Sequence, residues 1–201
     1  MKFRIGLGVV YAWLMIAATS CTFTPAAKNA MPSPANTKVA SSQEDDPPAA
    51  MVTPTLDAPP VGLKVGYTAP NFTLEDLQGS EVVLSDLRGQ AVLMNFWAVW
   101  CGFCRVEMPE LQTAYDTYGD EGFVVLGIDV GEEAKQVAPF VQEMGVTFPI
   151  LLDRRGSVTQ QYHIRGLPTS IVIDADGVIR AVHVGPVTER QIARYLAEMA
   201  K

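Results

Sequence analysis

The chain is poor in the residues that usually bind metals. Its 201 residues include three cysteines and two histidines, His163 and His183. Cys101 and Cys104 form one C-x-x-C motif, and the third cysteine, Cys21, lies far from it. A zinc site would need a second C-x-x-C or a histidine pair at zinc-finger spacing, and the sequence has neither. The motif is therefore better explained as a redox dithiol than as half of a zinc site, and we expect no metal or other cofactor.

Positive charge is also scarce. The chain has 15 Lys and Arg against 22 Asp and Glu, which gives a formal net charge of −7. No long basic run occurs, and Arg154-Arg155 is a short pair in a predicted loop. Because phosphate binding needs clustered Lys and Arg, the composition argues against a nucleic-acid partner.

The apolar run at residues 5–18 is too short for an ordinary membrane span. Lys2 and Arg4 precede the run, and small residues follow it. This order is typical of an export signal, so we predict a signal peptide over residues 1–20. Its removal would leave 13 basic and 22 acidic residues, a net charge of −9.

Cys21 directly follows the predicted signal peptide. Bacterial lipoprotein signals end in this way, and cleavage leaves a lipid-modified cysteine as the first residue. Ala18 stands where such signals usually carry leucine. Lipidation of Cys21 would give the unpaired cysteine a function, and membrane anchoring would follow. Ordinary secretory cleavage and an uncleaved anchor are the alternatives.

The composition predicts two further regions. Residues 22–61 contain eight of the 14 prolines and no apolar periodicity. We therefore predict a disordered, proline-rich tether over residues 21–60. The remaining residues, 61–201, are enough for one domain with a single core.

The C-x-x-C motif lies between a predicted strand and a predicted helix. Residues 91–97 and 122–129 are apolar on both faces, which predicts buried central strands. A helical pattern runs from about Cys101 to Tyr118. The free N–H groups and positive dipole end of a helix stabilise a thiolate. We therefore expect Cys101 to be the nucleophile of thiol–disulfide exchange.

Further elements complete a pattern of βαβ followed by a hairpin and a helix. Such alternation predicts a mixed central sheet covered by helices. The predicted elements are a β-hairpin at 71–75 and 81–84, a helical turn at 85–89, a helix at 132–144 kinked or broken at Pro139, a strand at 147–152, a helix at 157–162, paired strands at 170–173 and 178–184, and a helix from the capping box at Thr188 to Met199.

Five motifs occur together along residues 61–200. They are Gly66-x-x-Ala69-Pro70-x-Phe72, Leu84-Ser-Asp-Leu-x-Gly89, the segment from Val92 to Pro109 around Trp100-Cys-Gly-Phe-Cys104, Phe148-Pro-Ile-Leu-Leu-Asp153, and Arg165-Gly-Leu-Pro-Thr169. Together they resemble the thioredoxin fold, and in particular exported thiol–disulfide oxidoreductases of the TlpA/ResA type. The resemblance implies an α/β thioredoxin fold with an N-terminal β-hairpin extension.

The resemblance also implies roles for three residues outside the C-x-x-C motif. Pro168 is expected to be cis and to lie against the cysteines, with the backbone of Leu167 binding an extended substrate segment. Glu107 is expected to lie near the cysteines and to affect their proton chemistry. The alternatives are a plain turn at Pro168 and a solvated helix residue at position 107.

Two residues depart from related sequences. Asn95 occupies the place of a buried acid in cytosolic thioredoxins, so a base for the second thiol would have to be Glu107. Phe103 stands where the family often has proline, which leaves the redox potential open. We expect Trp97 to lie in the core and Trp100 to shield the disulfide and meet partners; the alternative places both in the core.

The implied function is reduction of extracytoplasmic protein disulfides, for example those of apocytochrome c, with electrons from a membrane thiol–disulfide transporter. Three alternatives stay open. A peroxiredoxin shares the Ala-Pro-x-Phe motif, but its Pro-x-x-x-Thr-x-x-Cys is missing. A copper chaperone typically has a C-x-x-x-C spacing and needs a third ligand, for which His163 and His183 have no supporting position. An oxidative folding catalyst runs the same chemistry in reverse.

Overall fold

The computed structural model describes residues 58–200. The predictions for the signal peptide, for Cys21 and for most of the tether fall outside these residues. In the described part of the chain, no helix combines the length and apolar character that crossing a membrane requires.

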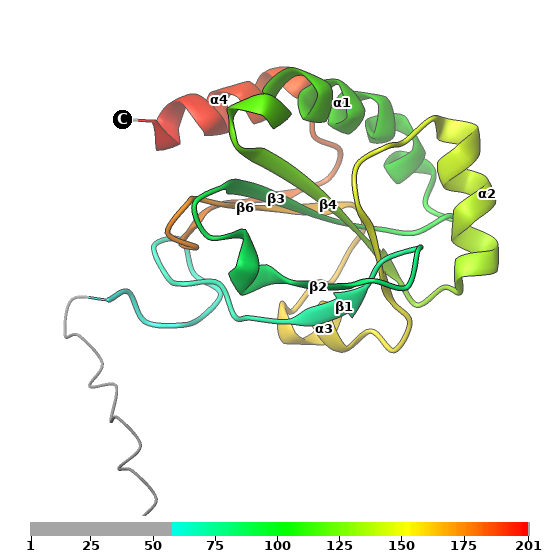
Figure 1. The fold of residues 1–201 in the computed structure, drawn as a ribbon, viewed down its shortest axis with the longest axis horizontal. Helices are drawn as coiled ribbons and strands as arrows, with labels where there is room; N and C mark the ends of the chain where they lie inside the picture. Colours follow the sequence, from blue (N-terminus) through cyan, green and yellow to red (C-terminus); the bar gives the residue numbers. More distant parts are fainter. Residues whose placement is uncertain (1–57, 201) are drawn as a thin grey trace, which may run out of the picture. The chain divides into compact units, whose positions relative to one another are not determined.

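A five-stranded mixed sheet forms the centre of the domain (Figure 1). Its strands, in spatial order, are β5 (Ile150–Asp153), β4 (Phe123–Val130), β3 (Ala91–Trp97), β6 (Thr169–Ile173) and β7 (Ile179–Val184). Strands β3, β4 and β5 are parallel, and β6 is antiparallel to both of its neighbours. The mixed sheet predicted from the order of elements is confirmed.

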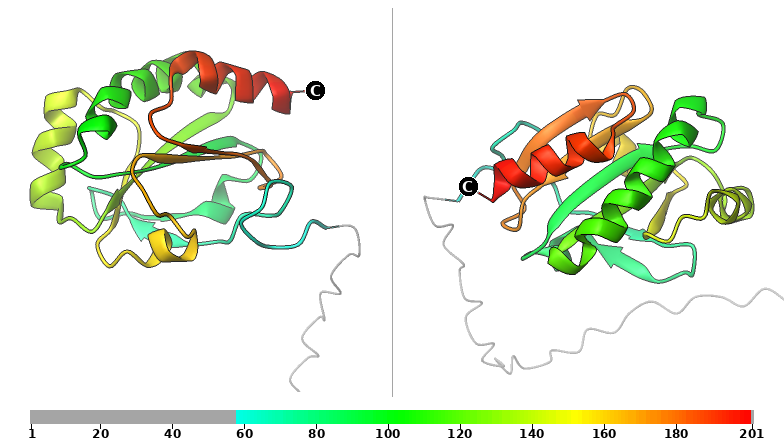
Figure 2. Two further views of the ribbon diagram at one scale, coloured as in Figure 1. Left: turned by 180° about the vertical axis from the view of Figure 1, so that it is seen from behind. Right: turned by 90° about the horizontal axis from the view of Figure 1, so that it is seen from above.

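Helices and a small hairpin cover the two faces of this sheet. Helices α1 (Gly102–Tyr118) and α4 (Glu189–Met199) lie side by side over one face (Figure 2). Helix α2 (Ala134–Met144) packs into the same layer through Val137 and Phe140. The other face carries the hairpin β1 (Thr73–Glu75) and β2 (Glu81–Val83), the 3-10 helix η1 (Leu84–Leu87) and helix α3 (Ser157–Gln161), while the 3-10 helix η2 (Gly119–Glu121) follows α1.

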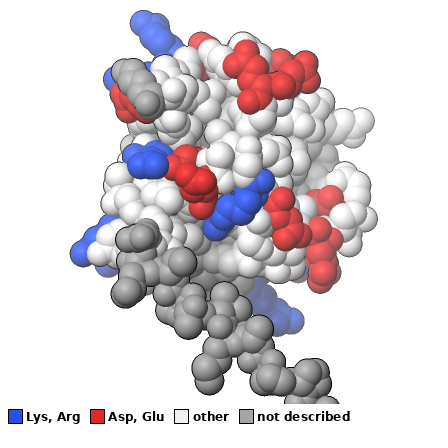
Figure 3. Space-filling view, turned by 60° about the vertical axis from the view of Figure 1, so that its left-hand side comes forward, with Lys and Arg blue, Asp and Glu red and all other residues white. Residues whose placement is uncertain are grey.

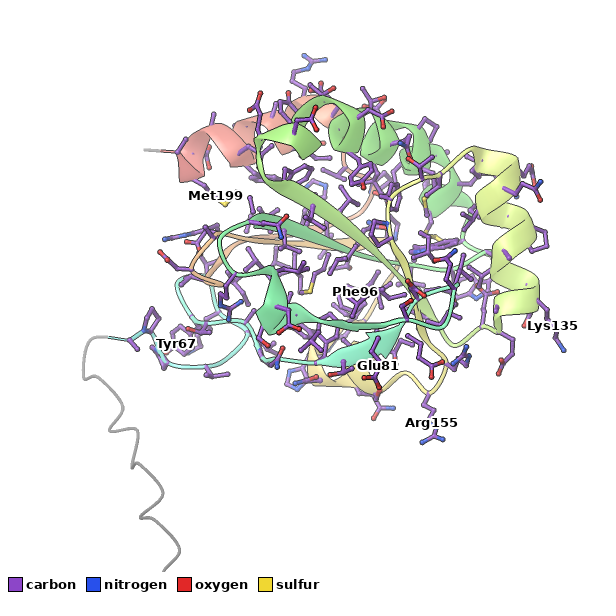
Figure 4. The ribbon with its side chains drawn as sticks, viewed as in Figure 1. Tyr67, Glu81, Phe96, Lys135, Arg155 and Met199 are labelled. Atoms are coloured by element: carbon purple, nitrogen blue, oxygen red, sulfur yellow. A yellow bond between two sulfur atoms is a disulfide. The ribbon has the colours of Figure 1, made fainter. Side chains whose placement is uncertain are left out.

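Alternation along β3 divides the core into two clusters. Leu93 and Trp97 face the helices α1 and α2, whereas Val92, Met94 and Phe96 face the hairpin. Phe96 lies in the layer between the sheet and the hairpin in Figure 4. Side chains of successive strand residues point to opposite faces, so one strand serves both clusters.

Most element predictions hold, with differences at the ends. The antiparallel hairpin is present, and Thr188 and Gln191 form the capping box that starts α4. The strand predicted at 147–152 begins later, at Ile150. A break at Pro139 does not occur: α2 continues through it, because Val137 and Phe140 anchor the helix in the core despite the missing N–H.

The topology separates two ends of the sheet. The carboxyl ends of β3 and β4 lead into α1 and towards α2, so both helices begin at one end, here called the cysteine end. The described chain enters at the other end, where the backbone of Tyr67 accepts a hydrogen bond from Ile179 (2.9 Å). Figure 4 shows Tyr67 and Lys135, in the first turn of α2, at opposite sides of the domain.

Candidate active site

Cys101 and Cys104 form a disulfide at the start of α1, with an S–S distance of 2.08 Å. Cys101 is the N-cap residue, and its Sγ accepts a hydrogen bond from the Cys104 N–H (3.2 Å). The side chains differ in access: Cys101 is 5% exposed and Cys104 is fully buried. An N–H donor and the helix dipole both favour negative charge on the Cys101 sulfur, which suits it to act as a thiolate.

Three exposed apolar residues are close to this disulfide in the sequence. Trp100, Phe103 and Val106 are each about 70% exposed. Trp97, by contrast, is fully buried and its ring lies 5.1 Å from that of Phe140. The two tryptophans therefore lie where the sequence placed them, one in the core and one on the surface, and the alternative with both in the core is wrong.

The peptide bond between Leu167 and Pro168 is cis, as the resemblance implied. Strand β6 begins directly after it, and Thr169 pairs with Phe96 at the carboxyl end of β3. This register brings the Leu167-Pro168 segment to the cysteine end. The Pro168 carbonyl accepts a hydrogen bond from Gly185 N–H (2.9 Å), which ties the segment to the end of β7.

Glu107 is buried, at 1% exposure, so its interpretation as a solvated helix residue is wrong. Its two carboxylate oxygens accept hydrogen bonds from Asn95 Nδ2 (2.8 Å) and from the Val187 N–H (2.9 Å). Asn95 also donates to Ser170 Oγ (3.0 Å). Burial raises the pKa of Glu107 to about 7, against the lowering effect of the two hydrogen bonds. The carboxyl group can therefore exchange a proton near neutral pH.

Three further buried acids at the cysteine end were missed in the sequence, and one of them is Asp153, at the end of β5, which is 1% exposed. Asp129, on β4, is fully buried, and Glu132, just after β4, is 8% exposed. Glu132 Oε2 accepts a hydrogen bond of 2.6 Å from the N–H of Val99, two residues before Cys101. The sequence did contain a signal for one of these buried acids. Asp129 is the one charged residue of an otherwise apolar strand, and it lies at the end of the sheet where the helix of the C-x-x-C motif begins.

The histidines occupy separate places. His163 has a positive φ of 53° in the turn after α3. His183 hydrogen-bonds through its ring to Tyr195 Oη (3.1 Å) and to the Pro186 carbonyl (3.2 Å). Among residues 58–200, no three His, Cys, Asp or Glu side chains gather in a way that could hold a metal ion.

The larger surface features lie away from the disulfide. A pocket of about 580 Å³ opens at the opposite end of the sheet, between the starts of β3 and β4 and the last turns of α4. On the face in Figure 3, acidic and basic side chains form small separate groups with uncharged surface between them. The site at the cysteine end is marked instead by the exposed apolar side chains and buried acids described above.

Known proteins share both the sequence and the fold. The model of the AhpC/TSA family matches residues 65–182. The thiol-disulfide oxidoreductase ResA of Geobacillus kaustophilus (strain HTA426) is 42% identical over 132 residues, which cover 66% of this chain and 76% of that protein.

Two crystal structures from Chlorobium tepidum are similar to the domain. A putative thiol:disulfide interchange protein DsbE superposes with a TM-score of 0.65 and 29% identity, covering 70% of this chain and all of that one. A thiol:disulfide interchange protein of the thioredoxin family superposes with a TM-score of 0.61 and 29% identity, covering 67% and 96%. Both likenesses agree with the thioredoxin fold implied by the motifs.

Proposed function

Because this chain belongs to the AhpC/TSA family and is a thiol–disulfide oxidoreductase of the ResA type, we propose that it reduces disulfides of extracytoplasmic proteins through Cys101 and Cys104. One observation carries the assignment of roles. The Cys101 sulfur lies at the helix start and accepts a hydrogen bond from an N–H group, and Cys101 keeps 5% exposure, whereas Cys104 has none. A substrate sulfur can therefore reach Cys101 first.

The exchange proceeds in two balanced steps. In the reduced enzyme, the Cys101 thiolate attacks one sulfur of the substrate disulfide, which forms a mixed disulfide and releases one substrate thiolate. Cys104, once deprotonated, attacks the Cys101 sulfur, and this step releases the second substrate thiolate. The two electrons of the enzyme dithiol now lie on the substrate, and the Cys101–Cys104 disulfide is restored.

Glu107 is the proposed proton acceptor for Cys104. The two residues lie three positions apart on α1, so they share one face of the helix, one turn from each other. Both are buried, and a carboxyl group with a pKa of about 7 is partly ionised at neutral pH. A base of this kind would activate the second thiol without contact with solvent.

The substrate is proposed to bind as an extended segment beside Leu167, with apolar side chains of the substrate against Trp100. The cis bond at Pro168 lies at the cysteine end, and Trp100 is 72% exposed there. Backbone pairing of this kind binds varied sequences, because its hydrogen bonds involve no side chains. Apocytochrome c, whose paired cysteines must be reduced before haem attachment, is a proposed substrate.

Export and anchoring depend on the part of the chain before the described residues. We propose that residues 1–20 are removed as a signal peptide, that Cys21 carries the lipid anchor, and that residues 21–60 tether a domain of residues 61–201. A membrane thiol–disulfide transporter would return electrons to the disulfide. Mass spectrometry of the native N-terminus should find acylated Cys21; an unmodified terminus at another residue would refute lipidation and leave export intact.

The proposed reduction is tested by equilibrium with glutathione and by insulin reduction. The potentials of thioredoxin-fold proteins range from roughly −270 to −120 mV, and a reductant lies at the negative end. A domain starting at Val61 should reduce insulin as fast per mole as the longer chain. A potential near the upper end would reverse the direction and indicate an oxidative catalyst. Peroxidase turnover with intact insulin would support the peroxiredoxin alternative, and copper binding by the reduced protein would support the chaperone.

A further inference from the structure

The loop that carries the nucleophile is held by a side chain from the segment that follows the neighbouring strand β4. Residues 98–101 connect β3 to α1, and the Cys101 N–H donates to the Ala98 carbonyl (3.1 Å). The other fixed point is the Val99 N–H, which donates to Glu132 Oε2 at 2.6 Å. Glu132 therefore connects the end of β4 to the residues immediately before Cys101.

Glu132 is in turn held by Asp129. The Glu132 N–H donates to Asp129 Oδ1 (3.2 Å), and Asp129 pairs in register with Trp97, the last residue of β3. Asp129 Oδ2 is buried and has no hydrogen-bond partner among the described residues. Two carboxyl groups thus lie together in a nearly dry position, and one oxygen is free to carry a proton.

None of the ion pairs among residues 58–200 involves Asp129 or Glu132. The charged groups on the surrounding elements are engaged elsewhere or exposed. On β5, Asp153 accepts hydrogen bonds from Ser157 and Thr159, and directly after β5, Arg154 pairs with Glu75 and Glu133. On α1, Arg105 pairs with Glu143, and Glu107 accepts hydrogen bonds from Asn95 and Val187. On α2, Lys135 points away from the sheet (Figure 4).

When two buried carboxyl groups have no cation beside them, ionising both of them costs a large free energy. Burial, the interaction with the Glu132 carboxyl group and the nearby charge of Asp153 together raise the pKa of Asp129 to about 8. The hydrogen bond from the Glu132 N–H acts in the opposite direction and lowers it. A proton held between two such groups belongs to the pair. With a pKa of about 8, Asp129 keeps its proton at neutral pH, and this proton lies beside the Glu132 carboxyl group.

We propose that Asp129 and Glu132 share one proton and act as a positioning pair, which fixes the loop that carries Trp100 and Cys101. The consequence for catalysis rests on the proposed function of Cys101. The existence of the proton-sharing pair does not depend on that function. When the proton leaves to solvent, two negative charges face each other, Glu132 turns towards water, and the Val99 N–H loses its acceptor. The loop, and with it the Cys101 sulfur, is then less firmly placed.

The experiment follows the Val99 amide by ¹H–¹⁵N NMR in the oxidised full chain. Cys101 and Cys104 do not titrate in the disulfide form, so their ionisation cannot contribute. The Val99 N–H signal should move upfield with a midpoint near pH 8, as its charged acceptor leaves. Asp129→Asn and Glu132→Gln should each abolish this titration, because an amide keeps the hydrogen bond without losing a proton.

Two controls separate the pair from its neighbours. Glu133→Gln changes the next residue, which is exposed and paired with Arg154, and should leave the Val99 titration intact. Glu107→Gln should leave it intact as well. A Val99 signal that does not titrate near pH 8, or that titrates equally in Asp129→Asn, overturns the proposal, as does loss of the titration in Glu107→Gln.

The catalytic consequence has its own readout. The measured quantity is the rate at which the reduced enzyme attacks a peptide disulfide, divided by the fraction of the attacking thiol that is ionised. In the wild type this normalised rate should fall above pH 8, and in Asp129→Asn the fall should be absent. Equal pH profiles would overturn the positioning role. If the Val99 signal titrates as expected but the enzyme exchanges no disulfides at any pH, the proposed function fails while the shared proton stands.

Discussion

Along β3, the two faces of the central sheet are both buried but differ in chemistry. On the hairpin face, β3 contributes only the apolar side chains of Val92, Met94 and Phe96, and the one buried acid of the sheet strands on this side is Asp153, at the end of β5. On the helix face, the alternate positions of the same strand include Asn95, which lies between Leu93 and Trp97 and bonds the buried Glu107. Asp129 on β4 is a second buried acid at the end of its strand.

This difference indicates where stability and function are separated in the domain. Buried polar groups cost free energy unless they are hydrogen-bonded, so a fold without a use for them would keep both faces apolar. The C-x-x-C motif lies at the start of α1, and both of its cysteines pack in the cluster on the helix face. We infer that the hairpin face mainly stabilises the fold, whereas the helix face also controls protons near the disulfide.

Phe96→Ala should have the largest effect on stability. The side chain is fully buried on the hairpin face, and such truncations cost about 3–5 kcal/mol. Denaturation of the oxidised protein should show this loss, while the folded fraction should reduce insulin at the wild-type rate. A selective loss of activity in folded protein would break the separation between the two faces.

Glu107→Gln should remove a pH dependence of stability. Glu107 is protonated more readily in the folded protein, since its pKa rises from 4.5 to about 7. Its contribution is therefore full below about pH 4.5 and is lost as pH rises through about 7, by on the order of 3 kcal/mol. Urea denaturation of the oxidised protein across this range measures the loss, and Glu81→Gln, on the exposed hairpin, is the control that should keep it.

The same variant should change the chemistry of the thiols. Without a proton acceptor next to Cys104, the second step should slow and the pH profile of thiol alkylation should shift. Alkylation and insulin reduction measured over the same pH range test this. Profiles that overlay those of the wild type would leave Glu107 with a structural role alone.

Trp100→Ala should have the smallest effect on stability, within about 0.5 kcal/mol, because the side chain is mostly exposed. The expected change is a higher KM for a protein disulfide with little change for a small disulfide reagent. An unchanged KM for both substrates would remove Trp100 from the binding surface. A large loss of stability would instead contradict its exposed position.

The sequence predicted the central strands, the capping box of α4 and the place of the C-x-x-C motif, because each depends on local residue patterns. For Glu107, the resemblance implied a place near the cysteines, whereas the local pattern alone left a solvated residue as the alternative, and the burial of the side chain contradicts that alternative. The buried residues 104, 107, 108, 111 and 114 share one helical face, and this periodicity was the available signal. The contact of Glu132 with Val99 joins residues 33 positions apart, so only the pairing of β3 with β4 reveals it.

The central claim is that Cys101, and not Cys104, attacks the substrate. Cys104→Ser should trap a mixed disulfide between Cys101 and a peptide disulfide, because the second step lacks its nucleophile. Mass spectrometry of the trapped complex after proteolysis identifies the bonded cysteine. The account predicts a complex through Cys101 in Cys104→Ser and little or none in Cys101→Ser. Equal trapping in both variants, or trapping only in Cys101→Ser, would contradict it.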